Sequence, residues 1–224
     1  MRLVMSRKMN IAIIVAGGSG LRFGGEIPKQ FVKMNGKEVI SYCVETFFGI
    51  EEIDKIVIVC HKDWIAHTQK LFTENKKISV ICGGESRFES SFNGLKFIHQ
   101  NGWVNSNVLI HDAARPFVSA EIIKNCISSL EEFSALSVSI PVVDTIVLAK
   151  DGFVVEVLDR SQLFGNQTPQ CFWFETIWSA YNFAETDKFT DDISVVLING
   201  GKVRILEGDS KNKKITKMED ILQD

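Results

Sequence analysis

The stretch Ile11-Ala-Ile-Ile-Val-Ala-Gly-Gly-Ser-Gly-Leu-Arg-Phe-Gly-Gly-Glu-Ile-Pro-Lys-Gln30 decides the fold of this chain. Residues 11–15 form an apolar, mostly β-branched run that breaks into small residues, which is typical of a buried strand ending in a loop. Arg22 and Lys29 follow the glycines. Because a glycine loop offers backbone N–H groups to an anion and the two cations add positive charge, the stretch predicts phosphate binding at the end of a strand.

Length and charge restrict what the chain can be. Its 224 residues are 45% hydrophobic and 24% charged, which is the usual composition of one sizeable, soluble α/β domain. The formal net charge of -3 gives no general positive field for nucleic acid or an anionic membrane. No segment approaches the roughly 18 apolar residues of a membrane span. Anion binding must therefore come from a local cluster, which points to a small ligand.

The cysteines and the first residues both favour a cytoplasmic protein. Four of the five cysteines lie in apolar stretches and none forms a C-x-x-C pair, so we expect buried, reduced thiols. They are Cys43, Cys60, Cys82, Cys126 and Cys171. The basic residues before position 11 superficially resemble the start of a signal peptide. The apolar run that follows is only about six residues long, shorter than the roughly 7–15 that a signal peptide needs.

Short apolar runs alternate with segments of helical periodicity over the first part of the chain. The predicted strands are 11–15, 56–60, 78–81 and 108–110, and the helices that follow them are 39–48, 64–71, 88–98 and 120–130. This alternation indicates an α/β fold with a single doubly wound, mostly parallel sheet covered on both faces. Such sheets bind ligands at the carboxyl ends of their strands. Residues 16–29, 83–87 and 111–116 should therefore share one edge.

The pattern changes after residue 136. Two strand-like runs, 138–149 and 153–158, flank a turn at Lys150-Asp-Gly152, which predicts a hairpin that stands off the sheet as a β-arm. Its apolar character makes region 138–170 a candidate dimer contact. A helix around 174–184, another that begins near 190–192, a strand at 203–206 and a last helix after 216 complete the chain. Since neither a linker nor a repeat interrupts it, we expect one domain over residues 1–224.

Two familiar phosphate-binding motifs do not fit the glycines at 17, 18 and 20. The dinucleotide fingerprint counted from Gly18 needs a third glycine where Phe23 stands, and no Gly-Lys-Ser/Thr closes a Walker loop. The glycines alone fit a tight strand-to-helix turn equally well. Arg22 and Lys29 favour the phosphate site, and Pro28 restricts the residue before it to extended backbone, which helps to position Lys29.

Together these residues resemble the opening motif of the nucleotidyltransferases that activate sugars and polyol phosphates. Later motifs look like those of the cytidylyltransferases that act on 2-C-methyl-D-erythritol 4-phosphate and on ribitol 5-phosphate, in family order from residue 12 to about 220. They are Gly83-Gly-Glu-Ser-Arg87 with Ser90 and Asn93-Gly-Leu95, His111-Asp-Ala-Ala-Arg-Pro116, Pro141-Val-Val-Asp-Thr-Ile146, Asp159-Arg-Ser-Gln-Leu163, Gln167-Thr-Pro-Gln170, Thr190-Asp-Asp192, Gly208-Asp209 and Asn212-Lys-Lys-Ile-Thr216.

The resemblance implies a Rossmann-like nucleotidyltransferase fold of the glycosyltransferase-A type. It also implies that an oxygen of the acceptor's phosphate attacks the α-phosphate of CTP in line and releases pyrophosphate. Such a step needs positioning and charge neutralisation more than acid–base groups. The residues that match the catalytic positions are Arg22, Lys29, Arg160 and Lys214. Arg160 would position the acceptor phosphate from a neighbouring subunit's arm, so the resemblance implies a homodimer.

The remaining family positions imply binding of CTP, the acceptor and Mg²⁺. The binding positions are Ala16, Gly17, Gly18, Gly20, Gly83, Gly84, Glu85, Arg87, Ser90, Asp112 and Thr190. The segment 83–90 would read cytosine and ribose, with Glu85 where the family often has Asp. Asp112 is the natural partner for Mg²⁺ or an acceptor hydroxyl, because carboxylates and phosphates suit this hard ion, and Asp209 is a second candidate. We expect a core role for His111 and leave a structural role open for Arg115.

Several alternatives stay open at this point. The motifs around 159 and 190 look more like the methylerythritol branch, in isoprenoid precursor synthesis, whereas Asp63-Trp-Ile-Ala-His67 looks like the ribitol branch, which makes CDP-ribitol. Lys213 stands where an apolar residue usually precedes the functional lysine, so Lys213 competes with Lys214 for that role. A nucleotide-binding module without catalysis, and uridylyl or guanylyl transfer to a sugar 1-phosphate, are the other hypotheses.

Overall fold

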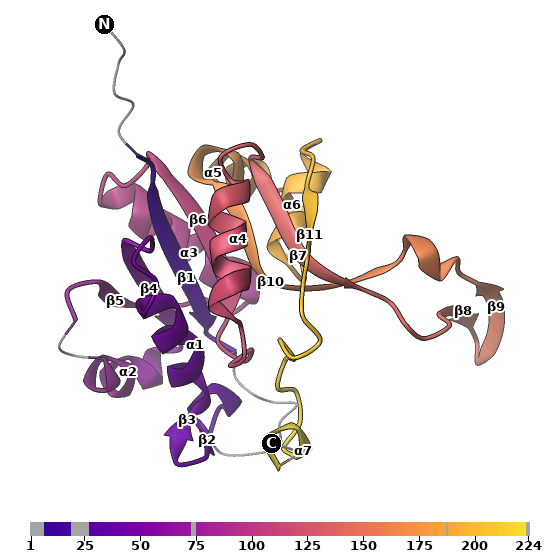
Figure 1. Cartoon of the computed structure of the whole chain (residues 1–224), viewed down its shortest axis with the longest axis horizontal. Helices are drawn as coiled ribbons and strands as arrows, with labels where there is room; N and C mark the ends of the chain where they lie inside the picture. Colours follow the sequence, from indigo (N-terminus) through magenta and orange to yellow (C-terminus); the bar gives the residue numbers. More distant parts are fainter. Residues whose placement is uncertain (1–6, 19–26, 73–74, 187, 223–224) are drawn as a thin grey trace, which may run out of the picture.

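The computed structural model describes residues 7–18, 27–72, 75–186 and 188–222. Its core is a seven-stranded sheet of order β11-β7-β10-β6-β1-β4-β5 (Figure 1). The strands are β1 (Met9–Ala16), β4 (Lys55–Cys60), β5 (Ile78–Cys82), β6 (Ser106–Asp112), β7 (Ala135–Pro141), β10 (Phe164–Trp173) and β11 (Arg204–Glu207). The pairs β1–β4, β1–β6, β4–β5 and β7–β11 are parallel, and β10 is antiparallel to both β6 and β7. The prediction of a mostly parallel α/β sheet is confirmed.

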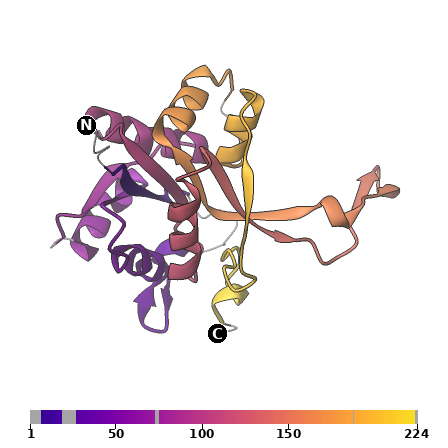
Figure 2. The ribbon, with the colours of Figure 1, turned by 45° about the horizontal axis from the view of Figure 1, so that its top comes forward.

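Helices cover both faces of this sheet (Figures 1 and 2). They are α1 (Val39–Phe48), α2 (Ile65–Leu71), α3 (Arg87–Gln100), α4 (Ala120–Ser129), α5 (Phe174–Phe183), α6 (Asp192–Ile198) and α7 (Glu219–Leu222). Side chains alternate along β1, so that Ala12 and Ile14 pack with α1 and α4 while Ile11 and Ile13 pack with α3, α5 and α6. Because both faces of β1 are buried, the strand reads as a continuous apolar run.

Side-chain caps fix where three of these helices begin. Ser86, Ser119 and Asp191 precede α3, α4 and α6, and each side-chain oxygen accepts a backbone N–H from the first turn of its helix. Such a cap satisfies a donor that the helix itself leaves without a partner. Since α3 and α6 both begin next to the strand ends, their caps place Arg87 and Asp192 at the same edge of the sheet.

A hairpin of β8 (Val147–Lys150) and β9 (Phe153–Val157) extends away from the body, as predicted (Figures 1 and 2). Asp151 and Gly152 both have positive φ angles, 52° and 84°, and this suits the tight turn of a two-residue hairpin. The predicted region 138–170 is wider than the part that leaves the sheet. Its first residues belong to β7 and its last to β10, a strand that the sequence patterns did not reveal.

One small hairpin and three short 3-10 turns were also not predicted. A second hairpin joins β2 (Lys33–Met34) to β3 (Lys37–Glu38) through Asn35 and Gly36, again with positive φ angles. Short 3-10 turns cover Lys29–Phe31, Lys62–Trp64 and Arg160–Gln162.

The cysteines agree with the prediction of buried thiols, since four of them are buried and Cys82, the fifth, is exposed. Within the described ranges, no helix has the length and apolar character needed to cross a membrane.

Candidate active site

The predicted strand-end segments meet at one edge of the sheet. Val15 near the end of β1 is in register with Asp112 at the end of β6, and Ala16 with Cys60 at the end of β4. The backbone N–H of Gly83 donates to the carbonyl of Cys60 at 2.8 Å, which brings the next loop to the same place. For their described residues, the prediction that these segments share an edge is confirmed, and the edge is where an open α/β sheet binds its ligands.

Ser90 is the point where the two glycine segments converge. Its side chain is buried, and its hydroxyl accepts the backbone N–H of Gly84 at 3.2 Å. A Cβ atom on Gly17 would lie 2.6 Å from the Ser90 Oγ, and one on Gly83 would lie 2.8 Å from it. A side chain at either glycine would therefore displace the Ser90 hydroxyl from its present position. This contact joins the loop after β1 to the segment expected to read the base.

Gln30 is a site residue that the sequence analysis did not identify. Its buried side-chain amide donates to the carbonyl of Ala16 at 2.7 Å and to that of Gly18 at 3.2 Å. The neighbouring Lys29 donates from Nζ to the carbonyl of Ile215 at 2.6 Å. The turn that carries Lys29 is thus attached both to the start of the glycine loop and to the C-terminal segment. Gly20 and Arg22 lie outside the described residues.

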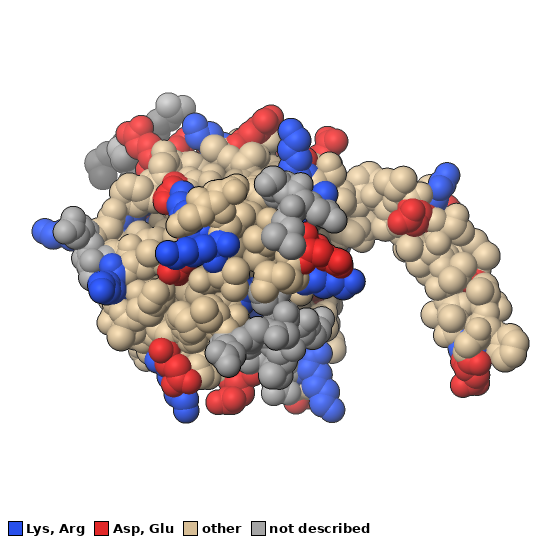
Figure 3. Space-filling model, turned by 90° about the horizontal axis from the view of Figure 1, so that it is seen from below, with Lys and Arg blue, Asp and Glu red and all other residues tan. Residues whose placement is uncertain are grey.

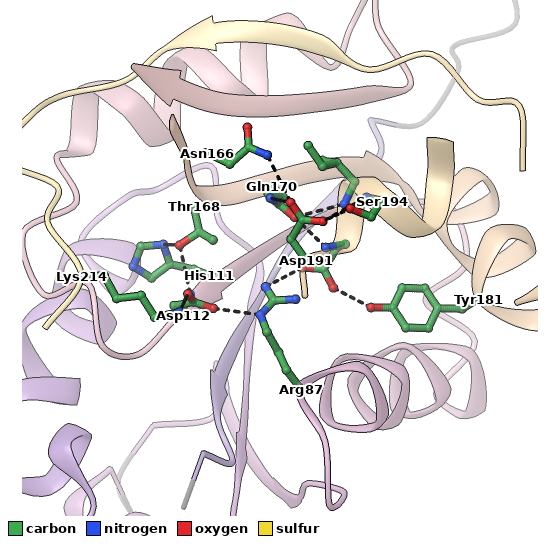
Figure 4. A network of polar contacts seen from close by, with 12 residues as sticks. Arg87, His111, Asp112, Asn166, Thr168, Gln170, Tyr181, Asp191, Ser194 and Lys214 are labelled. Carbon is green, nitrogen blue, oxygen red and sulfur yellow. Dashed lines mark hydrogen bonds and ion pairs between the residues drawn. The ribbon is translucent and has the colours of Figure 1, made fainter. Parts of the chain in front are cut away.

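A chain of alternating charges lies at the end of β6 (Figure 4). Asp112 accepts from Arg87 Nε at 3.2 Å on Oδ1 and pairs with Lys214 Nζ at 2.6 Å on Oδ2. A second nitrogen of Arg87 pairs with Asp192 Oδ2 at 2.7 Å, and the Tyr181 hydroxyl donates to Asp192 Oδ1 at 2.6 Å. The four charged groups come from α3, β6, α6 and the C-terminal segment, so the sheet edge is where these parts are tied together.

Burial and ion pairing have opposite effects on the pKa values of Asp112 and Arg87. Burial alone raises the pKa of Asp112, but Arg87 and Lys214 outweigh burial and hold that pKa well below its ordinary range. Burial likewise opposes the charge of Arg87, and Asp192 with Asp112 outweighs it, so the pKa of Arg87 is raised. Asp112 is therefore a carboxylate, and Arg87 a guanidinium, at neutral pH. A carboxylate held between two cations at a strand end can orient a lysine toward a phosphate.

His111 has the core role that the sequence analysis expected. It is fully buried, with Nδ1 at 2.9 Å from the Thr168 hydroxyl and Nε2 at 3.0 Å from the carbonyl of Arg115. Burial lowers the pKa of His111 to about 4, so the ring is neutral at pH 7. The same Thr168 hydroxyl accepts the backbone N–H of Asp112 at 3.1 Å. Through Thr168, His111 therefore supports the end of β6, where Asp112 lies.

A cavity of about 440 Å³ opens beside Lys214, lined in part by Arg115, Asn166 and Gln167. Arg115 donates to the carbonyls of Asn212 at 2.8 Å and Asn166 at 3.2 Å, so it ties its loop to backbone rather than to carboxylates. Lys213 is exposed, whereas Lys214 pairs with Asp112. Of the two lysines that competed for one role, the geometry favours Lys214.

The side chains of three predicted, described site residues form no hydrogen bond or ion pair with this network. Glu85 is exposed, and its backbone N–H donates to the Glu89 side chain at 2.6 Å. Thr190 is exposed just before α6. Arg160 lies on the arm, where it donates to the carbonyl of Val143 at 2.9 Å. A single copy of the chain therefore carries Arg160 away from Asp112 and Lys214, as Figure 1 shows for the arm as a whole.

The carboxylates allow only a limited metal site. Within the part of the chain that the structure describes, no group of three or more His, Cys, Asp or Glu residues could hold a metal ion. Asp209 instead closes a turn, because its Oδ1 accepts the backbone N–H of Lys211 at 2.8 Å. Mg²⁺ at nucleotide sites typically takes one or two carboxylates together with phosphate oxygens and water. Asp112 could supply one such carboxylate, although both of its oxygens are paired with Arg87 and Lys214 in this structure.

The segment 63–67, which looked like the ribitol branch, has a packing role. Trp64 stacks on Phe31 with ring centroids 4.4 Å apart, and His67 meets both rings edge-on. His67 Nε2 lies 2.9 Å from Glu38 Oε1. Because Phe31 ends the 3-10 turn that begins at Lys29, this aromatic cluster supports the turn. In this chain the side chains of Trp64 and His67 therefore pack against the turn that follows Pro28.

Comparison with known proteins decides the family. The family model described as IspD, 2-C-methyl-D-erythritol 4-phosphate cytidylyltransferase, matches residues 10–224. The chain belongs to this family. It is similar to the 2-C-methyl-D-erythritol 4-phosphate cytidylyltransferase of Thermosipho africanus, at 40% identity over 216 residues and 95% of each chain. It is also similar to the enzyme of that name from Clostridioides difficile, at 39% identity over 95% of this chain and 91% of the relative.

Solved structures agree with this assignment to the IspD family. The 4-diphosphocytidyl-2C-methyl-D-erythritol synthase of Anaerococcus prevotii superposes with a TM-score of 0.83 at 31% identity, covering 96% of this chain and 93% of the other. The 2-C-methyl-D-erythritol 4-phosphate cytidylyltransferase of Francisella tularensis gives a TM-score of 0.80 at 30% identity over 96% and 97%. The resemblance to a cytidylyltransferase family and the prediction of an enzyme are thereby confirmed. This chain is a cytidylyltransferase.

Proposed function

We propose that this protein transfers CMP from CTP to 2-C-methyl-D-erythritol 4-phosphate and releases pyrophosphate, a step that serves isoprenoid precursor synthesis. The observation that carries the proposal is the pairing of Lys214 with Asp112 at 2.6 Å, at the strand-end edge where the loop after β1 meets Ser90. The names of the relatives at 38–40% identity support the same acceptor. Family membership supports the nucleotide.

The proposed step needs no general base on the protein, because the acceptor's phosphate already carries negative charge. One of its oxygens forms a bond to the α-phosphorus of CTP, and the bond from that phosphorus to the β-phosphate oxygen breaks. The electron pair leaves with pyrophosphate. In our proposal Lys29 and Lys214 neutralise the charge that builds up around the α-phosphorus, together with Arg22. Preorganised cations of this kind lower the barrier because they need not reorient during the reaction.

Nucleotide binding is assigned by the same proposal to the strand-end loops. Ala16, Gly17 and Gly18 would approach the triphosphate through their backbone, as would Gly20. Gly83, Gly84, Glu85 and Ser90 would hold cytosine and ribose, and Arg87 and Asp112 would close the site beneath them. Thr190 would lie beside the acceptor. Asp112 would hold Mg²⁺, which when bound offsets the charge of the triphosphate and of the departing pyrophosphate. Asp209 is not part of this proposal.

A homodimer belongs to the proposal because the apolar side chains of the arm are left exposed in a single copy of the chain. Every residue of β8 and β9 is exposed, including apolar ones such as Leu148, Phe153 and Val155. Figure 3 shows the arm as a projection with few charged side chains. Apolar surface of this kind marks a protein contact. We infer that a second copy covers it, and that Arg160 reaches the second copy's site. The reduced thiols favour the cytoplasm.

The test is pyrophosphate release from the purified protein. We expect turnover with CTP, Mg²⁺ and 2-C-methyl-D-erythritol 4-phosphate, and none when the metal is chelated. Parallel reactions replace the acceptor with ribitol 5-phosphate, or CTP with UTP or GTP. Turnover with ribitol 5-phosphate alone would move the proposal to the other acceptor, and calorimetric CTP binding without any turnover would indicate a binding module.

A further inference from the structure

We propose that Asp192 is a positioning residue for the transfer step, acting through Arg87 and Asp112 on Lys214. The inference rests on the proposed function, because Lys214 is given its role there. Asp192 itself is fully buried beneath the site, at the start of α6, and its side chain holds Arg87 and the Tyr181 hydroxyl. Figure 4 shows Arg87 between Asp112, which pairs with Lys214, and the carboxylate that accepts the Tyr181 hydroxyl.

The guanidinium of Arg87 joins two carboxylates through different nitrogens. Its Nε lies 3.2 Å from Asp112, and one terminal nitrogen lies 2.7 Å from Asp192. Because the guanidinium is planar and rigid, fixing one side of it fixes the direction of the other. Asp192 therefore sets how Arg87 meets Asp112. The signs of the charges alternate from Asp192 to Lys214, so each group has an opposite charge beside it.

Removing the negative charge of Asp192 would redirect Arg87. A guanidinium that loses one of two carboxylate partners turns more of its N–H groups toward the remaining partner, because the fork geometry matches a carboxylate. That partner is Asp112. Lys214 would then compete with Arg87 for the same oxygens, and its ammonium would lose the position set by the 2.6 Å contact. A small misplacement of a group at the reacting centre can cost about 100-fold in rate.

The carboxylate of Asp192 is not what holds α6 in place. The backbone N–H groups of Asp192 and Ile193 donate to the Gln170 side-chain oxygen at 2.8 Å and 3.2 Å, and the cap of the helix is Asp191. These contacts do not depend on the charge of residue 192. An amide at this position can still accept from the Tyr181 hydroxyl. The variant Asp192→Asn therefore changes the link to Arg87 while leaving the helix start its other partners.

The experiment measures kcat and KM for CTP, together with the melting temperature, in wild type and Asp192→Asn. We expect kcat to fall on the order of 10- to 100-fold, with KM changed much less, as when the support of a functional group is lost. The matched control is Asp54→Asn. Asp54 also pairs with an arginine and a backbone N–H, but it lies before β4, at the opposite end of the sheet. This control should keep the wild-type kcat.

A double-mutant cycle separates positioning from a general loss of structure. If Asp192 acts through Arg87, then Arg87→Lys combined with Asp192→Asn should be no slower than Arg87→Lys alone. Multiplying effects, or a wild-type kcat in Asp192→Asn, would overturn the inference. If Asp192→Asn does not fold, Tyr181→Phe decides, because it removes only the hydroxyl that holds Asp192. A several-fold lower kcat then supports the role and an unchanged kcat contradicts it. Inactive wild type would instead mean that the proposed function has failed.

Discussion

The charged side chains at the sheet edge are paired with one another, whereas the side chains of the arm are exposed. At the sheet edge, Arg87 and Lys214 share Asp112, and the network closes within one chain. On the arm, the Arg160 side chain donates to the backbone carbonyl of Val143, and the apolar residues of β9 are exposed. The difference teaches that one copy of the chain closes the network at the sheet edge, while the described residues of the same chain leave the apolar surface of the arm exposed.

The largest effect should come from breaking the sheet edge at Lys214. Lys214→Ala removes a cation next to the proposed reacting phosphorus and leaves Asp112 with Arg87 alone. We expect kcat to fall on the order of 100- to 1000-fold, as when one stabilising donor is lost from a transition state. Pyrophosphate release measures it. Lys213→Ala is the matched control, since Lys213 is adjacent and exposed. Equal losses in both variants would contradict the assignment of Lys214.

The free energy of unfolding should fall in acid, because His111 is buried at the sheet edge in its neutral form. An unfolded histidine binds a proton near pH 6.5, whereas the buried ring has a pKa of about 4. The unfolded state therefore takes up a proton first, so this stability is complete above pH 6.5 and is lost as the pH falls toward 4. The difference corresponds to about 3 kcal/mol. Denaturant unfolding at several pH values measures it.

The control for the acid effect is His111→Gln, whose side chain does not titrate in this range. It should be less stable than wild type at pH 7, because it loses contacts to Thr168 and Arg115. Its free energy of unfolding should nevertheless change less between pH 6.5 and 4. A slope as steep as that of wild type would show that His111 is not the group responsible.

A smaller effect should follow from breaking the arm. Phe153 and Val155 are both exposed apolar residues of β9, and Val155 lies at the bulge that shifts the pairing of β9 with β8. Phe153→Asp with Val155→Asp should weaken the proposed dimer about 30-fold, or about 2 kcal/mol, as loss of an apolar interface cluster typically does. Light scattering measures the mass. Phe183→Asp is the matched control, since Phe183 on α5 is 72% exposed and Phe153 is 77% exposed. A monomeric wild type would contradict the proposed assembly.

The comparison also explains what could be predicted from the sequence. Strands β1, β4, β5 and β6 are apolar runs, so their pattern follows directly from burial on both faces. Strand β10 escaped prediction because polar residues, Gln167, Thr168 and Gln170, are buried within it. Their partners come from elsewhere in the chain, such as His111 for Thr168 and the carbonyl of Asp209 for Gln167. Only the end of β10, with the buried Cys171 and Phe172, is apolar, so its pattern is too short to predict the whole strand.

The candidate site was predicted in a similar, partial way. Motif residues such as Lys29, Asp112 and Lys214 could be named, because phosphate chemistry and family resemblance select them. The roles of Gln30 and Asp192 could not, since each acts through a contact that only the fold creates. Arg87 and Asp192 are 105 positions apart in sequence. No local pattern links an arginine to an aspartate over that separation, and only the cap positions of α3 and α6 bring the two together.

Mixing two inactive variants tests most directly whether the sheet edge of one copy works with the arm of another. Lys214→Ala damages the floor of the site and Arg160→Ala damages the arm. If the proposed site is shared, each mixed dimer contains one intact site, so an equal mixture allowed to exchange subunits should recover about a quarter of wild-type pyrophosphate release. If mixed dimers form and the activity stays at the level of the separate variants, the arm does not complete a neighbour's site.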